Sequence, residues 1–507
     1  MKKILINMLM FVLILFLSYT NVVASEIETL ASATSYDGRN AAIITPVRDQ
    51  GDSSLCWAYA AISAAEASIL KSGVAPGKTE DTLTLSPIQL GYARHNRGAD
   101  PLRNTEGENT GEDWYYGSGN SSYAPSLFSQ WCGPVNGDLS ATCNGWENAS
   151  FLLKDSVSFD GSNLKTDSEA RFEIKKAIIQ YGAVTFSYNN VRESYYYNPS
   201  SETGGGSYPH ACTIIGWDDT IPASSFLPGA ASQNGGWLIK NSYSSLPYFY
   251  LSYDNVSSNV YAFSFTDKEE YDYNYFYDSD TLDFGLGALL RPRRTANIFE
   301  AKKGEPTKRE YICATNIGIE GKNTTLTVRI YQDIQDPSNP LSGDLAATEE
   351  VYLENAGYYT VSLSEPVCIE EGSMFSVVAE ISDGENSYFK ITQNQGKSFF
   401  NQNGSWMSVP YATRIKAYTK LIDEKIYFTD TTAHLKTDEL DDGIFIMGYY
   451  SKNKVEDLRL FAVKASETYS FDIPREWKKA DGCQIKGFLW KSISSMIPIF
   501  CNEIVWE

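Results

Sequence analysis

The fold of this chain is decided by residues 50–61, which read QGDSSLCWAYAA. Cys56 opens an alanine-rich stretch that predicts a helix through Leu70, and Gln50 precedes the cysteine by six positions. A cysteine at a helix N-terminus is placed to ionise, because unbonded N–H groups and the helix dipole stabilise a thiolate. A thiolate attacks carbonyl carbon, and the N–H of Cys56 and the amide of Gln50 could donate to the resulting oxyanion. The alternative is a Cys56 that only fills a buried helix turn.

A nucleophilic cysteine needs a base, and the chain has only three histidines. His95 lies at the polar end of a predicted helix and His434 in a predicted strand, so both are expected at the surface. His210 opens the apolar strand ACTIIGW at 211–217, where it could project into a cleft or merely cap the strand. Asn241 ends another apolar strand, at 236–240, and could accept a hydrogen bond from a histidine ring. This chain order of glutamine, cysteine, histidine and asparagine suits acyl transfer through a thiolate–imidazolium pair.

The composition predicts an exported protein of several domains. A length of 507 residues fits two to four domains. Met1–Ala24 has a lysine pair, an apolar core and a small-residue end, which are typical of a cleaved signal peptide, with a membrane anchor as the alternative. Loss of its two lysines takes the net charge from −21 to −23. Such acidity argues against nucleic acid or anionic lipid as a partner. No other segment is apolar enough to span a membrane.

Export permits disulfides, and the chain has eight cysteines. A nucleophilic Cys56 must stay reduced. Pairing by proximity in the sequence leaves Cys212 as a buried thiol and predicts the bridges Cys132–Cys143, Cys313–Cys368 and Cys483–Cys501. No cysteine or histidine spacing indicates a zinc site.

The pattern of elements predicts three folded regions after a short pre-segment at 25–36. In residues 37–267, helices at 58–70, 85–92, 122–130 and 168–181 are followed by strands at 183–188, 211–217, 236–241 and 248–253. Helices before strands indicate an α+β domain with two lobes. Residues 272–420 read as short alternating strands without a helix, which indicates a β-sandwich. Residues 421–507 are again β-patterned and predict a small β-domain.

Three separated motifs of the first region resemble the papain family of cysteine peptidases. They are VRDQG with CWA (47–51 and 56–58), HA with IIGWD (210–211 and 214–218), and WLIKNS (237–242). The stretch LSPIQL at 85–90 is similar to the second helix of that family. The resemblance implies a two-lobed papain-like fold and hydrolysis of peptide bonds with no required cofactor and no metal.

The same resemblance assigns roles to four residues. Cys56 would be the nucleophile, His210 the general base and then acid, Asn241 the residue that orients His210, and Gln50 the oxyanion donor. Residues GSGN at 117–120 resemble the glycine strip that pairs with the substrate backbone, or else form a flexible loop. The predicted substrate-binding residues are Gly117, Ser118, Gly119 and Trp57.

The chain departs from the family pattern at three positions near these motifs. Ser53 stands where many members have a disulfide cysteine. Leu55 replaces a small residue before the nucleophile, so it is expected to crowd that turn. Tyr243 replaces a tryptophan, so the shielding of the histidine–asparagine bond is expected to be weaker.

The second region resembles the lectin-like domain that follows the peptidase in certain clostridial-type surface proteases. The matching segments are ANIFEA (296–301), TVRIY (327–331), GYYTV (357–361), EGSMFSV (371–377), GKSFF (396–400) and IKAYT (415–419). The resemblance implies a jelly-roll sandwich, in which Trp406 and acidic side chains could hold sugar or calcium, or Trp406 could be packed. The third region, with KGFLW at 486–490, is similar to small β-domains of Gram-positive surface proteins and implies an interaction role.

Together these features predict a secreted or cell-surface cysteine-type peptidase that acts on protein or peptide substrates. The β-domains would bind a cell-wall or surface polymer. The alternative is a catalytically weak or inactive adhesin on a papain fold, which the changes at Leu55 and Tyr243 favour. Thiol-dependent transpeptidation uses the same residues as hydrolysis, so the sequence does not separate the two.

Overall fold

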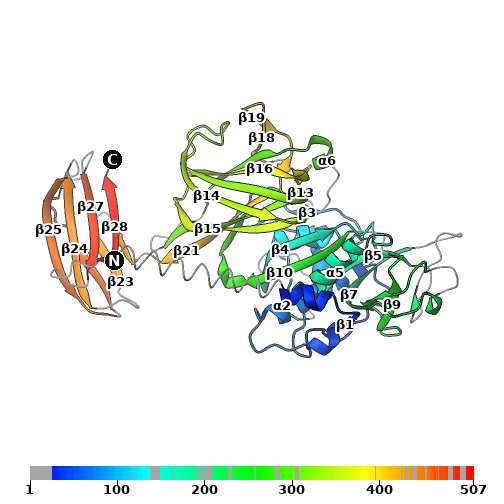
Figure 1. The fold of residues 1–507 in the computed structure, drawn as a ribbon. Helices are drawn as coiled ribbons and strands as arrows, with labels where there is room; N and C mark the ends of the chain where they lie inside the picture. The colour runs from blue at the N-terminus through cyan, green and yellow to red at the C-terminus, as the bar shows by residue number, and fades with distance from the viewer. Residues whose placement is uncertain are drawn as a thin grey trace. The chain divides into compact units, whose positions relative to one another are not determined.

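The computed structural model describes most of the chain after residue 24 and divides it into two compact units. The described residues are 25–117, 119–137, 149–162, 164–190, 196–197, 208–226, 231–255, 259–279, 286–302, 308–393, 396–423, 425–428, 432–436, 442–451, 454–465, 467–477, 483–490 and 498–506. The first unit is Met1–Glu300, Ile312–Val367 and Ser373–Lys420, and the second is Ala301–Tyr311, Cys368–Gly372 and Leu421–Glu507 (Figure 1). The expected signal peptide, Met1–Ala24, lies outside the described residues.

The first unit contains the four helices that the sequence predicts. They are α2 (Cys56–Ser72), α3 (Pro87–His95), α4 (Tyr123–Ser129) and α5 (Ser168–Tyr181). Their ends follow from capping residues. Ser86 accepts a hydrogen bond from the N–H of Gln89 at the start of α3, and Gly73 closes α2 in the left-handed region with a φ of 71°. The candidate nucleophile is thus the first residue of α2.

The strands of this part follow in antiparallel order. They are β1 (Ser35–Asp37), β2 (Asn96–Arg97), β3 (Glu108–Asn109), β4 (Phe151–Phe159), β5 (Val184–Asn190), β6 (Tyr196–Tyr197), β7 (Tyr208–Asp218), β8 (Gly236–Lys240), β9 (Tyr248–Ser252) and β10 (Val260–Asp267). Strand β7 lies between β5 and β8, and β10 pairs with β4. All four strands that the sequence predicts here are present.

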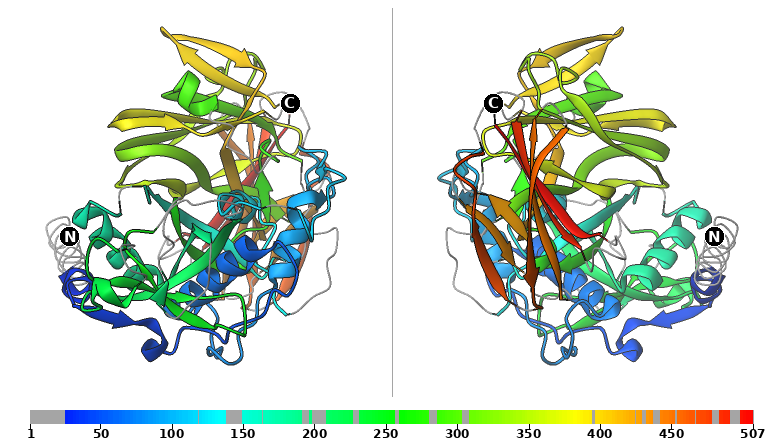
Figure 2. Two further views of the ribbon diagram at one scale, coloured as in Figure 1. Left: turned by 90° about the vertical axis from the view of Figure 1, so that its right-hand side faces the viewer. Right: turned by 90° about the vertical axis from the view of Figure 1, so that its left-hand side faces the viewer.

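Helices cover both faces of this sheet (Figure 2). One core packs the alanines of α2 against Ala211, Ile215 and Phe263. The other core packs α5 against Cys212 and Ile214 of the same strand, β7. Successive β7 side chains therefore enter different cores, as the period of two requires. The arrangement confirms the α+β fold.

The second region is built from antiparallel strands, as predicted, but several of them are longer than the short strands that the sequence indicated. They are β11 (Tyr273–Tyr275), β12 (Arg294–Glu300), β13 (Lys308–Gln332), β14 (Asp344–Leu353), β15 (Ala356–Ile369), β16 (Met374–Phe389), β17 (Ile391–Thr392), β18 (Ser398–Gln402), β19 (Ser405–Val409), β20 (Ala412–Thr413) and β21 (Ile415–Asp423). The expectation of no helix here was wrong, because a short α-helix of five residues, α6 (Leu286–Leu290), precedes β12. Residues 356–359 of β15 pair with residues 155–158 of β4, so one hydrogen-bonded ladder joins the two regions.

A buried charge cluster also joins the two regions of the first unit. Asp278 accepts hydrogen bonds from Lys416 at 2.9 and 2.7 Å and from Arg414 at 3.2 Å, and all three side chains are fully buried. Arg414 also donates to Ser126 of α4 at 2.8 Å. Removing the Asp278 carboxylate would leave two buried cations without it, so the cluster fixes this junction.

The second unit has two sheets around one core. Its strands in Leu421–Glu507 are β22 (Ile426–Phe428), β23 (Thr432–Lys436), β24 (Gly443–Ser451), β25 (Lys454–Val463), β26 (Thr468–Asp472), β27 (Cys483–Trp490) and β28 (Pro498–Trp506). One sheet is β22-β23-β26 and the other is β25-β24-β27-β28. Apolar residues of both sheets, including Leu435, Phe445 and Leu489, share the core.

The predicted disulfides do not form among the described residues. Cys132, Cys313, Cys368 and Cys483 are all present as thiols, which contradicts the three predicted bridges. In the β27–β28 pair, Cys483 is opposite Trp506 and Cys501 is opposite Phe488, so the strand register holds these two cysteines apart. Cys143 lies outside the described residues. Cys212 is buried, as expected, with 2% exposed.

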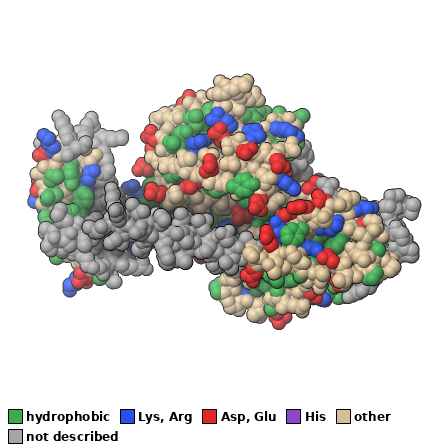
Figure 3. Space-filling view, in the orientation of Figure 1, with side chains coloured by type: hydrophobic (Ala, Val, Ile, Leu, Met, Phe, Trp, Pro, Cys, Tyr) green, Lys and Arg blue, Asp and Glu red, His purple; other side chains and the backbone are tan. Residues whose placement is uncertain are grey.

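Acidic and basic side chains are mixed on the visible surface of the described residues (Figure 3). Asp and Glu side chains are spread over the visible face among Lys and Arg (Figure 3), in keeping with the net charge of −21. Within the described ranges, no helix has both the length and the apolar character needed to cross a bilayer. Nor do these residues contain a cluster of His, Cys, Asp or Glu suited to a metal ion. Calcium binding by the β-sandwich stays a prediction.

Candidate active site

Cys56 meets His210 where the start of α2 faces strand β7. A hydrogen bond joins the Cys56 sulfur to the His210 ring. Burial would raise the pKa of the Cys56 thiol, but this bond and the charge of His210 outweigh burial and lower the pKa. Leu55, the N-cap residue of α2, supplies no side-chain cap, and the Trp57 N–H of the first turn donates to the Cys56 sulfur. The arrangement favours a thiolate beside an imidazolium.

Asn241 holds the other side of the His210 ring. The distance from His210 Nε2 to Asn241 Oδ1 is 3.0 Å, and the two residues are 6% and 4% exposed. The Asn241 amide is itself fixed, because its Nδ2 donates to the Leu246 carbonyl at 3.0 Å and its Oδ1 accepts from the Ser242 N–H at 2.8 Å. A fixed acceptor on Nε2 leaves Nδ1 to face Cys56.

Tyr243 covers the bond between His210 and Asn241. Its ring stacks on His210 with centroids 5.5 Å apart and planes 28° apart. A tyrosine ring is smaller than the tryptophan ring of the family, so weaker shielding stays a prediction. An aromatic face beside a buried imidazole excludes water from that bond and strengthens it.

Gln50 is locked beside the cysteine by two short hydrogen bonds. Its Oε1 accepts from Ser242 Oγ at 2.5 Å, and its Nε2 donates to the Ser53 carbonyl at 2.6 Å. The Ser53 hydroxyl donates back to the Gln50 carbonyl at 2.8 Å. Ser53 thus braces the loop in place of a disulfide. One Nε2 hydrogen of Gln50 remains for a ligand, because a primary amide has two donors.

Cys212 joins this site, which the sequence analysis missed. Its sulfur lies 3.5 Å from Asn241 Oδ1 and contacts the His210 ring. Burial lowers the pKa of His210, but Cys212 first and then Cys56 raise it well above its ordinary value. Residues two apart on a strand share a face, so alternation on β7 could have placed Cys212 beside His210.

The Cys212 thiol beside the His210 ring should influence the alkaline limb of the pH profile of kcat/KM. We expect Cys212→Ala to shift this limb of kcat/KM to lower pH, because His210 then loses its proton sooner. The acid limb, set by the Cys56 thiol, should move little. Cys212→Ser keeps a hydrogen-bonding group but not the charge of a thiolate, so it should shift the alkaline limb in the same direction by a smaller amount. Identical alkaline limbs for Cys212→Ala and the unaltered protein would contradict this role.

Leu55 does not crowd the turn, contrary to expectation. It is 1% exposed and packs against Gly91 of α3, where an added Cβ would lie 2.6 Å from Leu55 Cδ2. The missing side chain on α3 makes room for the large residue before the nucleophile.

The effect of Gly91→Ala on the free energy of unfolding should therefore change sign when the residue at position 55 is made smaller. Alone, it should lower the free energy of unfolding by about 1–2 kcal/mol, because overpacking exceeds the helix-propensity gain of about 1 kcal/mol. In a Leu55→Ala background the same change should be neutral or stabilising. Urea denaturation of the four proteins measures the difference, and equal effects in both backgrounds would rule out the contact.

The predicted glycine strip lies next to the turn that precedes Cys56. The N–H and hydroxyl of Ser54 donate to the carbonyls of Tyr115 and Tyr116, at 2.9 and 3.0 Å. Gly119 lies so close to Trp57 that an added Cβ would meet its ring at 1.9 Å. Trp57 is 3% exposed and thus supports the strip from behind. Ser118 lies outside the described residues, and substrate binding by Gly117 and Gly119 stays a prediction.

The other histidines lie elsewhere. His95 was expected to be solvated, but it is 5% exposed, with its Nδ1 2.8 Å from Thr110 Oγ1. The loop after α3 folds back over it through the β2–β3 pairing. His434 lies in β23, as expected, with its Nδ1 3.0 Å from Ser470 Oγ.

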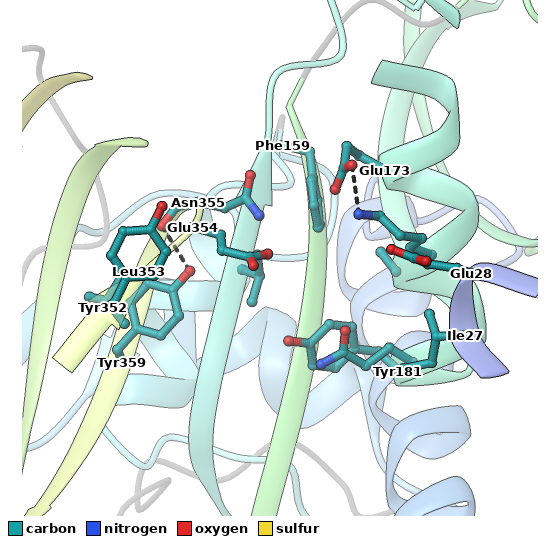
Figure 4. A pocket seen from close by; sticks show the side chains of 14 residues that line it. Ile27, Glu28, Phe159, Glu173, Tyr181, Tyr352, Leu353, Glu354, Asn355 and Tyr359 are labelled. Carbon is teal, nitrogen blue, oxygen red and sulfur yellow. Dashed lines mark hydrogen bonds and ion pairs between the residues drawn. The ribbon is translucent and has the colours of Figure 1, made fainter. Parts of the chain in front are cut away.

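A separate cavity of about 540 Å³ lies between α5 and the β14–β15 turn. Figure 4 shows Tyr352, Glu354 and Asn355 on one side and Glu28 and Glu173 on the other. Its lining includes neither cysteine nor histidine, so it offers no nucleophile–base pair.

Comparisons with known proteins agree with this geometry. Residues 32–247 match the papain family of cysteine proteases, and residues 275–419 match the lectin like domain family. This chain is similar to the crystal structure of the cysteine protease and lectin-like domains of Cwp84, a surface layer associated protein of Clostridium difficile. The two sequences are 19% identical, and the TM-score is 0.60 over 77% of this chain and 89% of that chain. The structure of Cwp84 after propeptide cleavage is 20% identical, with a TM-score of 0.59 over 77% of this chain and 100% of that chain. The two proteins therefore share a fold. This chain therefore contains a papain family cysteine protease domain at residues 32–247, followed by a lectin-like domain at residues 275–419.

Proposed function

We propose that this protein is a secreted or surface-associated peptidase that hydrolyses peptide bonds through Cys56, His210 and Asn241. The observation that carries the proposal is the contact chain from Cys56 through His210 to Asn241, with the pKa of the thiol lowered and that of the imidazole raised. These shifts favour the ion pair that a cysteine peptidase uses.

The proposed reaction proceeds in two steps. The Cys56 thiolate attacks the peptide carbonyl, and the oxyanion accepts hydrogen bonds from the Cys56 N–H and Gln50 Nε2. His210 then gives its proton to the leaving amine, which releases one peptide and leaves a thioester. Water attacks the thioester, with His210 as base, and frees the second peptide and the thiol.

Alkylation and cleavage together test the proposal. The full chain should cleave a peptide library only with a thiol reductant present, and iodoacetamide should label Cys56 fastest and abolish cleavage. Cys132 is the internal control, because burial raises its pKa to about 12. Absence of cleavage, with Cys56 labelled no faster in folded than in denatured protein, would reject the proposal. Products joined to an added amine would indicate transpeptidation instead.

The inactive-adhesin alternative loses its support near the site. It depended on Leu55 and Tyr243, and the first fits against Gly91 while the second stacks on His210. We nevertheless propose a binding role for the β-domains, with a cell-wall or surface polymer as partner. The export pattern of Met1–Ala24 and the surface-layer association of Cwp84 support an extracellular location.

A further inference from the structure

Four neighbouring strands of the lectin-like domain carry one row of polar and aromatic side chains. Arg294 of β12 is opposite Glu380 of β16, and Asn401 of β18 is opposite Trp406 of β19. The β12–β18 register, in which Thr295 is opposite Phe400, puts Arg294 next to Asn401. Cross-strand neighbours share a face of a sheet. The row therefore runs from Glu380 of β16 through Arg294 of β12 and Asn401 of β18 to Trp406 of β19.

Three members of this row, Arg294, Asn401 and Trp406, form one wall of a cavity of about 450 Å³, within the range of about 300–1,000 Å³ for small-molecule sites. The segment containing Ser338, Asn339 and Leu341 forms the other wall. One edge of Trp406 packs on a small apolar cluster that includes Ile298 and Phe399, which holds the ring in place. The rest of the ring remains available to a ligand, because Trp406 is only partly buried.

The amides in the cavity present donors. Asn401 Oδ1 accepts from the Gly404 N–H at 3.2 Å, and Asn339 Oδ1 accepts from the Leu341 N–H at 3.1 Å. These bonds fix both amides, with each Nδ2 group on the side opposite to its bonded Oδ1. In the described part of the chain, neither Nδ2 has an acceptor. Both are therefore directed at a ligand rich in oxygen.

The cavity also carries a positive charge, in a chain whose net charge is −21. Glu380 pairs with Arg294 at 3.3 Å and with Arg329 at 3.1 Å. Arg294 lines the cavity, whereas its ion-pair partner Glu380 does not, so the guanidinium is the charged group that a ligand meets there. The Arg294 guanidinium lies 5.9 Å from the Trp406 ring centre, so charge and ring lie together. A guanidinium beside fixed amide donors suits a carboxylate.

We propose that this cavity binds an acidic saccharide, with the sugar ring on Trp406 and its carboxylate at Arg294. The hydroxyls accept hydrogen bonds from Asn339 and Asn401. This proposal deepens the proposed polymer-binding role of the β-domains and is independent of peptide hydrolysis. The cavity beside α5 fits such a ligand less well, because Glu28, Glu173 and Glu354 line it with only one lysine.

Calorimetry with two oligosaccharides tests the proposal on the full chain. A hyaluronan tetrasaccharide, which carries glucuronate, should bind more tightly than uncharged chitotetraose. Trp406→Ala should weaken binding of the acidic sugar about tenfold or more, as for an aromatic anchor. Asn401→Asp keeps the acceptor for Gly404 but replaces the donor by a charge, so it should weaken binding comparably without disturbing the turn. Arg294→Gln should remove the preference for the acidic sugar.

Tyr352→Ala is the matched control, because this tyrosine is 61% exposed on the same domain and lines the other cavity. It should leave binding unchanged. Absence of binding of either oligosaccharide at millimolar concentration would overturn the proposal. So would full affinity in both Trp406→Ala and Asn401→Asp, or loss of affinity in Tyr352→Ala alone. Acetate at equal concentration should not compete; if it displaces the sugar, the site binds a carboxylate only.

Discussion

Cys56→Ala should reduce kcat/KM for peptide cleavage by about 10⁴-fold or more, as loss of a nucleophile does in other acyl-transfer enzymes. The Cys56 thiol is hydrogen-bonded to the His210 ring. Among the described cysteines, Cys56 alone combines a position at a helix start with a lowered pKa. Alanine removes only the sulfur and preserves helix propensity, so the fold should remain. The measurement is single-peptide cleavage under reductant, with circular dichroism to verify folding.

The matched control is Cys132→Ala. Cys132 is also a thiol near α4, but it is fully buried and its pKa is raised to about 12. Its removal should leave the cleavage rate within about twofold, since a buried thiol of raised pKa is inert. Equal activity of Cys56→Ala and the unaltered protein would show that another group performs the chemistry.

Local patterns were enough to predict the protease fold because each element agrees with its sequence. Serine before proline marks the start of α3, and aspartate at 167 marks that of α5. Alternation and apolar runs locate β7 and β8, which deliver His210 and the residue before Asn241. Because the site lies at the ends of these elements, predicting the elements also predicted which residues would meet.

The errors arose where contacts come from distant parts of the chain. His95 has polar sequence neighbours, yet a loop returning through Thr110 buries it. Leu55 looked too large for its turn, but the space it needs is provided by Gly91, some thirty-five residues later. Cysteine spacing likewise says nothing of strand direction, so the predicted bridges Cys132–Cys143, Cys313–Cys368 and Cys483–Cys501 were wrong.

Gln50 should have the second-largest effect on catalysis. Removal of one oxyanion donor costs about 10²–10³-fold in kcat in comparable sites. We expect Gln50→Glu to fall in this range, because it retains an oxygen for Ser242 Oγ and loses the Nε2 donor. KM should change little, since the oxyanion exists only in the transition state and intermediate.

Ser242→Ala separates the donor role of Gln50 from its structural role. This change removes the 2.5 Å hydrogen bond to Gln50 Oε1 but keeps Nε2, which the Ser53 carbonyl still holds at 2.6 Å. If Gln50 acts as a donor, Ser242→Ala should lower kcat by far less than Gln50→Glu does. If Gln50 only braces the loop, each variant breaks one of its two bracing contacts, and their rates should fall by similar amounts. A fall in kcat for Gln50→Glu alone therefore identifies Nε2 as the group that meets the oxyanion.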